Sequence, residues 1–320
     1  MKIMLRSFLS TVLFLFFCSL TVLSANDDKV LLRYKWNVGE KIEGKIQFEG
    51  EIKFTNRHIW KLRYDDNQLE GKPKKVITRK EEDSIVPFKK EQLYLINVLS
   101  TDKEGAATVS IDIKTAYFSI NWGKGEKVTG PGEWMGPVKG RVSELGEVEA
   151  SDPSAWKKFS KEKVRAHQPL DPTLLKFPIR MVGIGDEWVI SKKYIDLLNP
   201  VSDFDYDVTY RLSGFKEAEG KRYAIIISEA NVERDILKGE WHPYKKEKEK
   251  RVELKDLKME FRREYLFDIQ AGQVVQMKGT PSASYNRLSL FRHGKREWCY
   301  EEDIKRFSTV TTELINAKTP

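Results

Sequence analysis

Strict alternation of apolar and charged residues over residues 42–54 is the feature that most constrains the fold of this chain. Isoleucine, phenylalanine and glycine occupy every second position, and glutamate, lysine or glutamine occupy the positions between them. A period of two with one polar side is typical of a long antiparallel strand with one face on a core and the other in water. The pattern recurs at 107–113, 203–212 and 261–269, so the sequence predicts a mainly β protein.

Short glycine-containing turns separate these strands and predict hairpins. Residues 100–105 join an apolar strand at 93–99 to the alternating stretch that follows it, and residues 145–146 form the turn of a second, shorter hairpin. The charged stretch 71–91 is predicted to be a looser connection.

A second organising feature is the stretch FPIRMVGIGDEWVI at residues 177–190, with a fainter copy, LLRYKWNVGEKI, at residues 31–42. Each copy combines an extended approach, a tight glycine turn and the start of a strand. A turn of this kind could be mistaken for a nucleotide-binding loop, but it lacks the third glycine and the helix that such a loop requires. The residues predicted to be structural here are Gly183, Gly185, Asp186 and Trp188.

Because similar segments follow each copy, the sequence favours antiparallel curved sheets in two similar β-units joined by a short helical segment. The first unit covers residues 26–150 and the second covers 178–320, with a charged insert at 231–260. The connector at 151–177 contains a serine cap, a proline in the first turn and apolar residues at helical spacing. A single continuous sheet without a repeat is the alternative.

The first 25 residues are predicted to be a cleaved signal peptide. A basic start is followed by an apolar run too short to span a membrane, and small residues allow cleavage after Ser24 or Ala25. We therefore expect a secreted or periplasmic protein with no transmembrane segment after signal cleavage; an uncleaved N-terminal anchor is the alternative. Cys299 is the only cysteine of the mature chain, which excludes an intramolecular disulfide.

No constellation of residues in the sequence indicates catalysis or a metal site. The four histidines are scattered, and no nucleophile elbow or phosphate-binding loop is present. Asp203, Asp205 and Asp207 imitate the start of a calcium loop, but the glycine and the final glutamate of that loop are missing. The sequence therefore predicts no catalytic residue, no metal and no cofactor. The net charge of +8 is mild, and no nucleic-acid-binding module is recognisable, so no nucleic-acid partner is expected.

Aromatic residues outside the periodic segments are the candidate ligand-binding residues. Trp122 and Trp134 lie in a glycine-rich stretch, and Trp241 and Tyr244 lie in the charged insert. Such side chains can stack on sugar rings or apolar ligands, or they can fold back to cover a sheet edge.

Several stretches together resemble an uncharacterised family of exported, signal-peptide-bearing β-rich bacterial proteins. These are RYKWNVGEK, FPIRMVGIGDEW, YRLSGFKEAEGKRYAIIISE and YLFDIQAGQVVQMKG. The resemblance implies export and a β-rich fold, and it brings no known activity and no site residues.

The predicted function is that of an exported, non-catalytic binding or envelope-associated protein with an apolar or glycan ligand. The alternatives are a scaffolding β protein for protein–protein contact and an extracellular hydrolase with an unrecognised site. The sequence names neither the ligand nor the envelope component that would be the partner.

Overall fold

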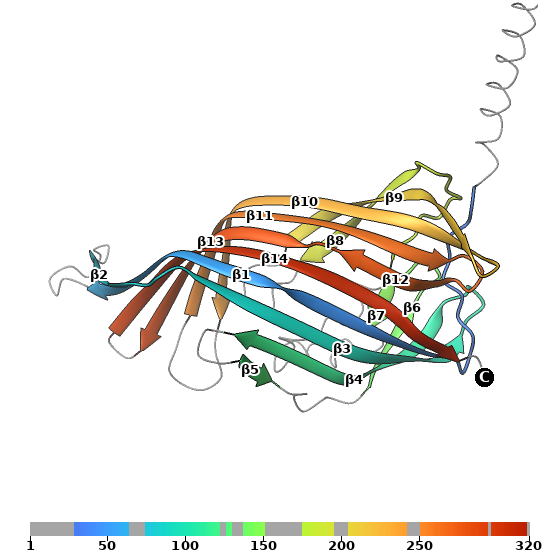
Figure 1. The fold of residues 1–320 in the computed structure, drawn as a ribbon, viewed down its shortest axis with the longest axis horizontal. Coiled ribbons are helices and arrows are strands. Elements are labelled where there is room, and N and C mark those ends of the chain that lie inside the picture. The colour runs from blue at the N-terminus through green and yellow to red at the C-terminus, as the bar shows by residue number, and fades with distance from the viewer. Residues whose placement is uncertain are drawn as a thin grey trace, which may run out of the picture.

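The fold was determined from a computed structural model, which describes residues 29–63, 74–121, 126–129, 137–150, 175–194, 204–241, 250–293 and 296–318. Fourteen strands form one sheet, and every pairing within it is antiparallel (Figure 1). The predicted mainly β, antiparallel fold is therefore confirmed. The strands are β1 (Lys41–Arg63), β2 (Lys74–Lys80), β3 (Ser84–Thr101), β4 (Ala107–Asn121), β5 (Glu126–Thr129), β6 (Val138–Val142), β7 (Val148–Ala150), β8 (Glu187–Tyr194), β9 (Phe204–Ala218), β10 (Lys221–Trp241), β11 (Lys250–Asp268), β12 (Gln273–Gly279), β13 (Ser282–His293) and β14 (Arg296–Lys318).

The order of the strands across the sheet is β7-β6-β4-β3-β1-β14-β12-β11-β10-β9-β8, with β2, β5 and β13 off this path. Strands from the first half of the chain lie on one side, strands from the second half lie on the other, and β1 meets β14 between them. The predicted helical connector at 151–177 lies outside the described residues except for its last three, which are not helical.

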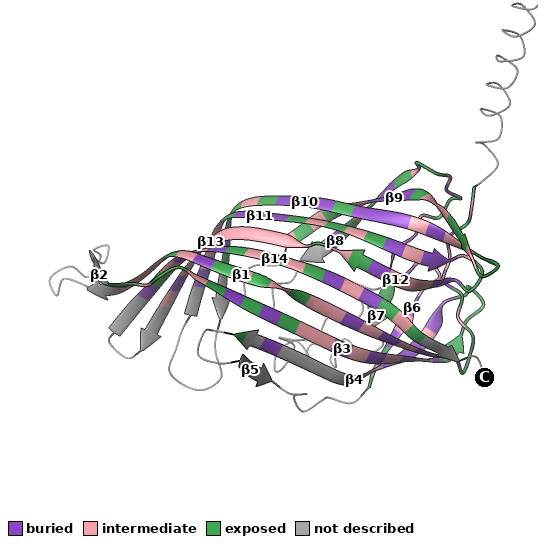
Figure 2. Ribbon diagram, viewed as in Figure 1, coloured by how far each residue is buried: buried purple, intermediate pink, exposed green. Residues whose placement is uncertain are grey.

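Alternating burial along β1 confirms the strand predicted from its period of two. Ile42, Ile46 and Phe54 are buried, whereas Lys41, Glu49 and Lys53 are exposed. Figure 2 shows buried residues separated by intermediate or exposed ones along β3, β10 and β14 as well. We call the face that carries the buried residues of β1 the inner face. It gathers the apolar side chains of the sheet.

Two charged segments of the sequence, 71–91 and 231–260, contribute strands to the sheet. Strand β2 and the first half of β3 lie within residues 71–91, which corrects the predicted loose connection. The described parts of the predicted charged insert at 231–260 extend β10 and β11 as one hairpin, paired from Asn231 with Glu260 to Trp241 with Lys250. Exposed charges such as Glu233, Lys238 and Lys258 occupy outward positions, where water solvates them, whereas Arg234 lies opposite the buried Leu257.

Two glycines of the inner face make room for large side chains from neighbouring strands. A Cβ atom at Gly44 would lie 2.2 Å from the Tyr94 hydroxyl, so the phenol ring occupies the space above that glycine. A Cβ atom at Gly279 would lie 2.7 Å from Cγ of Arg263. The glycines therefore let Tyr94 and Arg263 lie across the strands next to their own.

The main core lies between the sheet and two extended segments, residues 30–36 and 175–182. Val30 and Val182 pair as an antiparallel bridge, and Tyr34 packs on Phe177 and Phe267 with ring centroids 5.1 and 5.9 Å away. One buried cluster contains residues of both β6 and β8, which stand near or at opposite ends of the strand order. The sheet therefore curves around these two segments.

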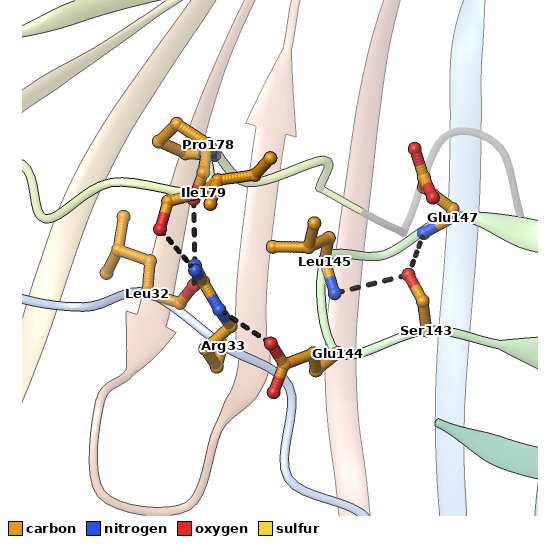
Figure 3. A network of polar contacts seen from close by, with 8 residues as sticks. All are labelled: Leu32, Arg33, Ser143, Glu144, Leu145, Glu147, Pro178 and Ile179. Atoms are coloured by element: carbon orange, nitrogen blue, oxygen red, sulfur yellow. Dashed lines mark hydrogen bonds and ion pairs between the residues drawn. The ribbon is translucent and has the colours of Figure 1, made fainter. Parts of the chain in front are cut away.

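We call the end of the sheet that is covered by residues 30–36 and 175–182 the closed end. Arg33 links three segments of the chain there (Figure 3). Its Nε donates to Glu144 Oε1 over 3.0 Å, and its Nη1 donates to the carbonyl oxygens of Leu32 and Pro178 over 2.7 and 2.8 Å. Its Nη2 donates to the Ile179 carbonyl oxygen over 2.5 Å. One guanidinium thus links the N-terminal segment, the β6–β7 turn and the segment before β8.

The turns that lead into β1 and β8 have the same hydrogen bonds. Gly39 donates its N–H to the carbonyl of Val98 over 2.9 Å, and Gly185 donates to that of Leu212 over 2.8 Å. Both glycines have positive φ, of 84° and 89°, which favours glycine because it has no Cβ. In each turn a carboxylate accepts from the backbone N–H three residues before it.

Candidate functional site

Three basic side chains, Lys90, Arg263 and Arg306, lie on the inner face beyond the closed end. We call them the inward cations. Each directly follows a second basic residue, and alternation along the strand directs the two to opposite faces. Their outward neighbours, Lys89, Arg262 and Lys305, are exposed, whereas the inward cations are only half-exposed. A basic pair in a strand therefore brings one cation onto the face that also carries the core.

Lys90 of β3 and Arg306 of β14 lie over aromatic rings of the inner face. Lys90 Nζ is 5.7 Å from the ring centroid of Phe48, and Arg306 Cζ is 4.8 Å from that of Phe88. Burial, and then the positive charge of Arg306, lowers the pKa of Lys90 to about 8. The two cations therefore raise the local positive potential in a place that water reaches only in part.

Arg263 of β11 lies in aromatic surroundings. Its Cζ is 4.7 Å from the ring centroid of Phe261, and its side chain is hydrogen-bonded to Tyr265. Burial lowers the pKa of Arg263, but Tyr265, Tyr206 and Tyr210 raise it, and the net change is upward. The guanidinium stays charged. Within the described part of the chain it makes no ion pair, and its Nε is buried without a hydrogen-bond acceptor.

Unpaired buried polar groups accompany the inward cations. Ser228 is the cross-strand partner of Arg263, and its fully buried hydroxyl has no hydrogen-bond partner. Gln92 and Thr312 flank Ile46 in the adjacent row, are 2% and 4% exposed, and also keep a polar atom unpaired. Leaving such a group unpaired costs about 1–3 kcal/mol, so a site with several of them is poised to accept a polar ligand group or water.

Apolar side chains extend from the inward cations toward the far end of β10 and β11. A second buried cluster there is formed by Val232, Leu237, Val252, Leu254, Leu257 and Met259. Phe204, Tyr206, Ala283 and Tyr285 pack against it. The inner face thus places cationic and unpaired polar groups between two apolar regions.

Two other arginines of the inner face, Arg57 and Arg287, share a buried carboxylate. Glu302, only 5% exposed, accepts from Arg287 Nε over 2.8 Å and from Arg57 Nε over 3.3 Å. Arg57 also pairs with Glu81 over 2.9 Å. The two arginines and the two glutamates balance one another's charge, so we do not expect them to bind a ligand.

The structural residues predicted around the Gly-x-Gly-Asp turn lie together at the closed end of the sheet. Gly183 donates its N–H to Asp186 Oδ2 over 3.0 Å, and Arg180 donates to the same oxygen over 2.9 Å. These two hydrogen bonds, in that order, lower the pKa of Asp186. Trp188 is buried, and its ring stacks on Tyr210 with centroids 5.6 Å apart.

The aromatic residues predicted to bind ligand are not brought into a described site. Trp122, Trp134 and Tyr244 lie outside the described residues. Trp241 is the last residue of β10, and its side chain lies outside the described part of the chain. Sequence reasoning missed the inward cations, although the basic pairs at 89–90, 262–263 and 305–306 could have revealed them.

Replacing Lys90 with methionine is expected to stabilise the protein at pH 7 and not at pH 11. The folded-state pKa of about 8 is below the unfolded value of 10.5, so the folded state carries the cost of a half-buried cation below pH 8. Between these two values the unfolded state binds more protons, and wild-type stability rises with pH. We expect Lys90→Met to raise the free energy of unfolding at pH 7 by about 1–2 kcal/mol, after allowance for the partial exposure of the side chain.

Urea unfolding at the two pH values measures this difference. Lys89→Met, which removes the outward neighbour, should change stability equally at both. A Lys90→Met gain that does not depend on pH would contradict the assignment of the cost to charge.

Within the described residues, no group of histidine, cysteine or acidic side chains is arranged to hold a metal ion. The same residues contain no helix of the length and apolarity needed to cross a membrane.

No family model matches the chain, and no curated protein matches its sequence. Among solved structures, the toluene transporter TodX of P. putida is 9% identical, with 88% of this chain and 91% of that chain covered and a TM-score of 0.13. A mutant of the Rh. blastica porin is 10% identical, with 82% and 99% covered and a TM-score of 0.12. At these TM-scores neither similarity contributes to the assignment of fold or function.

Proposed function

We propose that the protein is an exported, non-catalytic binding protein that holds an apolar ligand against the inner face of its sheet. The observation that carries this proposal is the combination of apolar side chains and unpaired polar groups on one curved face. A protein interior normally pairs its buried polar groups, whereas a ligand site keeps a few of them available among apolar walls. The predicted signal peptide supports export.

A scaffolding role and a hydrolase role have less support. Glu302, a buried carboxylate at an inward position of the described strands, is held by Arg57 and Arg287, whereas glycoside hydrolysis needs two carboxylates available for acid–base work. A glycan ligand would use the loop aromatics of the sequence analysis.

We further propose that the sheet consists of two similar β-units. The hydrogen bonds of Gly39 and Gly185 support this proposal, because they join β1 to the end of β3 and the start of β8 to β9 in the same manner. Positive-φ glycines also recur at the next matched turns, Gly105 with Gly220 and Gly146 with Gly272. The β1-β3-β4-β6-β7 and β8-β9-β10-β11-β12 paths are then equivalent meanders.

Expression of the full chain in an exporting bacterial host tests the function. We expect the protein in the periplasm or medium, with a new N-terminus at Ala25 or Asn26, and native mass spectrometry should detect an apolar molecule released by denaturation. After delipidation it should bind the neutral probe oleyl alcohol. Retention in the cytoplasm would refute export, and failure to bind any apolar probe would refute the binding role.

A further inference from the structure

We propose that the outside of the closed end binds to the surface of a phospholipid bilayer through a small group of exposed apolar side chains. These are Leu31, Ile179, Met181 and Ile184, which we call the apolar patch. The inference goes beyond the proposed function, because it concerns the outside of the closed end and not the inner face. Exposed apolar side chains that gather in one place mark contact surfaces for a membrane or another molecule.

The backbone pairing at the closed end brings Leu31 and Met181 together. Val30 and Val182 pair as an antiparallel bridge, and both side chains pack on the main core. Leu31 and Met181 are the next residues on the two segments, so alternation directs both to the opposite side, where each is about half exposed.

The other two members of the apolar patch lie on the same segment as Met181. Ile179 lies at a bend, where its carbonyl accepts from Arg33 (Figure 3), and its side chain is 80% exposed. Ile184 lies in the glycine turn that leads into β8 and is 59% exposed. An isoleucine this exposed contributes little to the core, so its apolar surface is available for contact with another phase.

Charged groups of both signs border the apolar patch. A Cβ atom at Gly183 would lie 3.5 Å from Cγ of Lys29, so the lysine stem lies over the turn segment. Arg180 is exposed and pairs with Asp186, and acidic residues at 27–28 precede Lys29 in the sequence. The local net charge is therefore small, and we expect apolar contact to drive the binding while the cations stay at the level of the headgroups.

The sequence before residue 29 favours a bilayer as the partner. The apolar run at residues 8–23, predicted to be a signal peptide, is joined to the closed end by residues 24–28, which span at most about 20 Å. An exported chain therefore has its closed end next to the membrane, whether the leader is cleaved or kept as an anchor.

The size of the apolar patch also favours a bilayer over a second copy of the chain. A stable protein–protein interface takes about 20–30 residues a side, far more than this group offers. Shallow insertion into the boundary between headgroups and acyl chains takes only a few apolar side chains.

Flotation of the purified, delipidated protein with phosphatidylcholine vesicles tests the inference. We expect the wild type to bind, and Ile179→Ser should weaken binding about tenfold, because one isoleucine no longer enters the lipid. Ile236→Ser is the matched control, because Ile236 is 53% exposed and lies on β10 opposite Lys255, away from the closed end. It should leave binding unchanged, and about 0.5 M NaCl should weaken wild-type binding by less than about twofold.

A fluorescent label at residue 179 measures insertion directly. Cys299 is buried, so Ile179→Cys in a Cys18→Ser background offers one accessible thiol within the described residues. A nitrobenzoxadiazole label there should shift its emission to the blue when vesicles are added, and nitroxide-labelled lipids should quench it. The same label at Ile236→Cys should do neither.

No vesicle binding by the wild type, or equal effects of Ile179→Ser and Ile236→Ser, would overturn the inference and leave the binding of apolar probes to the inner face untouched. Loss of binding in about 0.5 M NaCl would assign the binding to charge and so overturn the role of the apolar patch. If light scattering showed a wild-type dimer that Ile179→Ser converts to a monomer, a second copy would cover the patch, and the bilayer would be the wrong partner.

Discussion

Replacing Trp188 with alanine should lower the free energy of unfolding by about 3–5 kcal/mol, the usual cost of emptying a large aromatic site. The indole is only 7% exposed and stacks on Tyr210 at an interplanar angle of 10°. Its Nε1 also donates to the Lys176 carbonyl over 2.8 Å, which ties the segment before β8 to the sheet. Urea unfolding followed by circular dichroism measures the loss.

Trp188→Phe separates the two contributions of the indole. It keeps a ring against Tyr210 and removes the hydrogen bond, so we expect about half the loss of the alanine variant. A loss below about 1 kcal/mol for Trp188→Ala would contradict the anchoring role of this side chain.

Replacing Glu302 with glutamine should destabilise the protein by about 2–4 kcal/mol, because it leaves Arg57 and Arg287 without their shared negative charge. The carboxylate is nearly inaccessible, and both arginines keep only about a quarter of their side chains exposed. Removing one partner from a buried ion pair costs more than the pair contributes, because an uncompensated charge stays in place. Chemical denaturation at neutral pH gives the difference.

Glu313→Gln is the control on the same strand, because Glu313 is exposed. It should change stability by less than about 0.5 kcal/mol, as expected for a surface position. If Glu302→Gln were equally mild, the interaction among Glu302, Arg57 and Arg287 would contribute little to stability. Adding Arg287→Met to the Glu302→Gln variant would then leave the free energy of unfolding nearly unchanged as well.

Periodicity predicted the fold where a strand keeps one phase along its length. In β1 the phase holds from Ile42 to Phe54, and the predicted faces match the observed ones. In β11 the phase changes at a bulge: Asp256 has a φ of 53°, and burial moves from Leu257 and Met259 to Leu254 and Val252. A single period cannot follow such a shift, which is why residues 231–260 read as a charged insert.

The candidate site was harder to predict because it depends on which strands become neighbours. The inward direction of Lys90, Arg263 and Arg306 follows from alternation within each strand. Their arrangement depends on the pairing of β3 with β1, β1 with β14, and β14 with β12, and these strands come from both halves of the chain. No local pattern records that pairing.

The pairing of β1 with β14 puts the C-terminus at the centre of the sheet rather than at its edge. The register pairs Lys41 with Lys318, so β1 cannot form its pairing with β14 until β14 has been synthesised. Pairing β1 with β14 closes a loop of nearly the whole chain, which is slow. Until that pairing forms, the edge of β1 that faces β14 stays unpaired. Removing β14 would therefore divide the sheet in its middle, between β1 and β12.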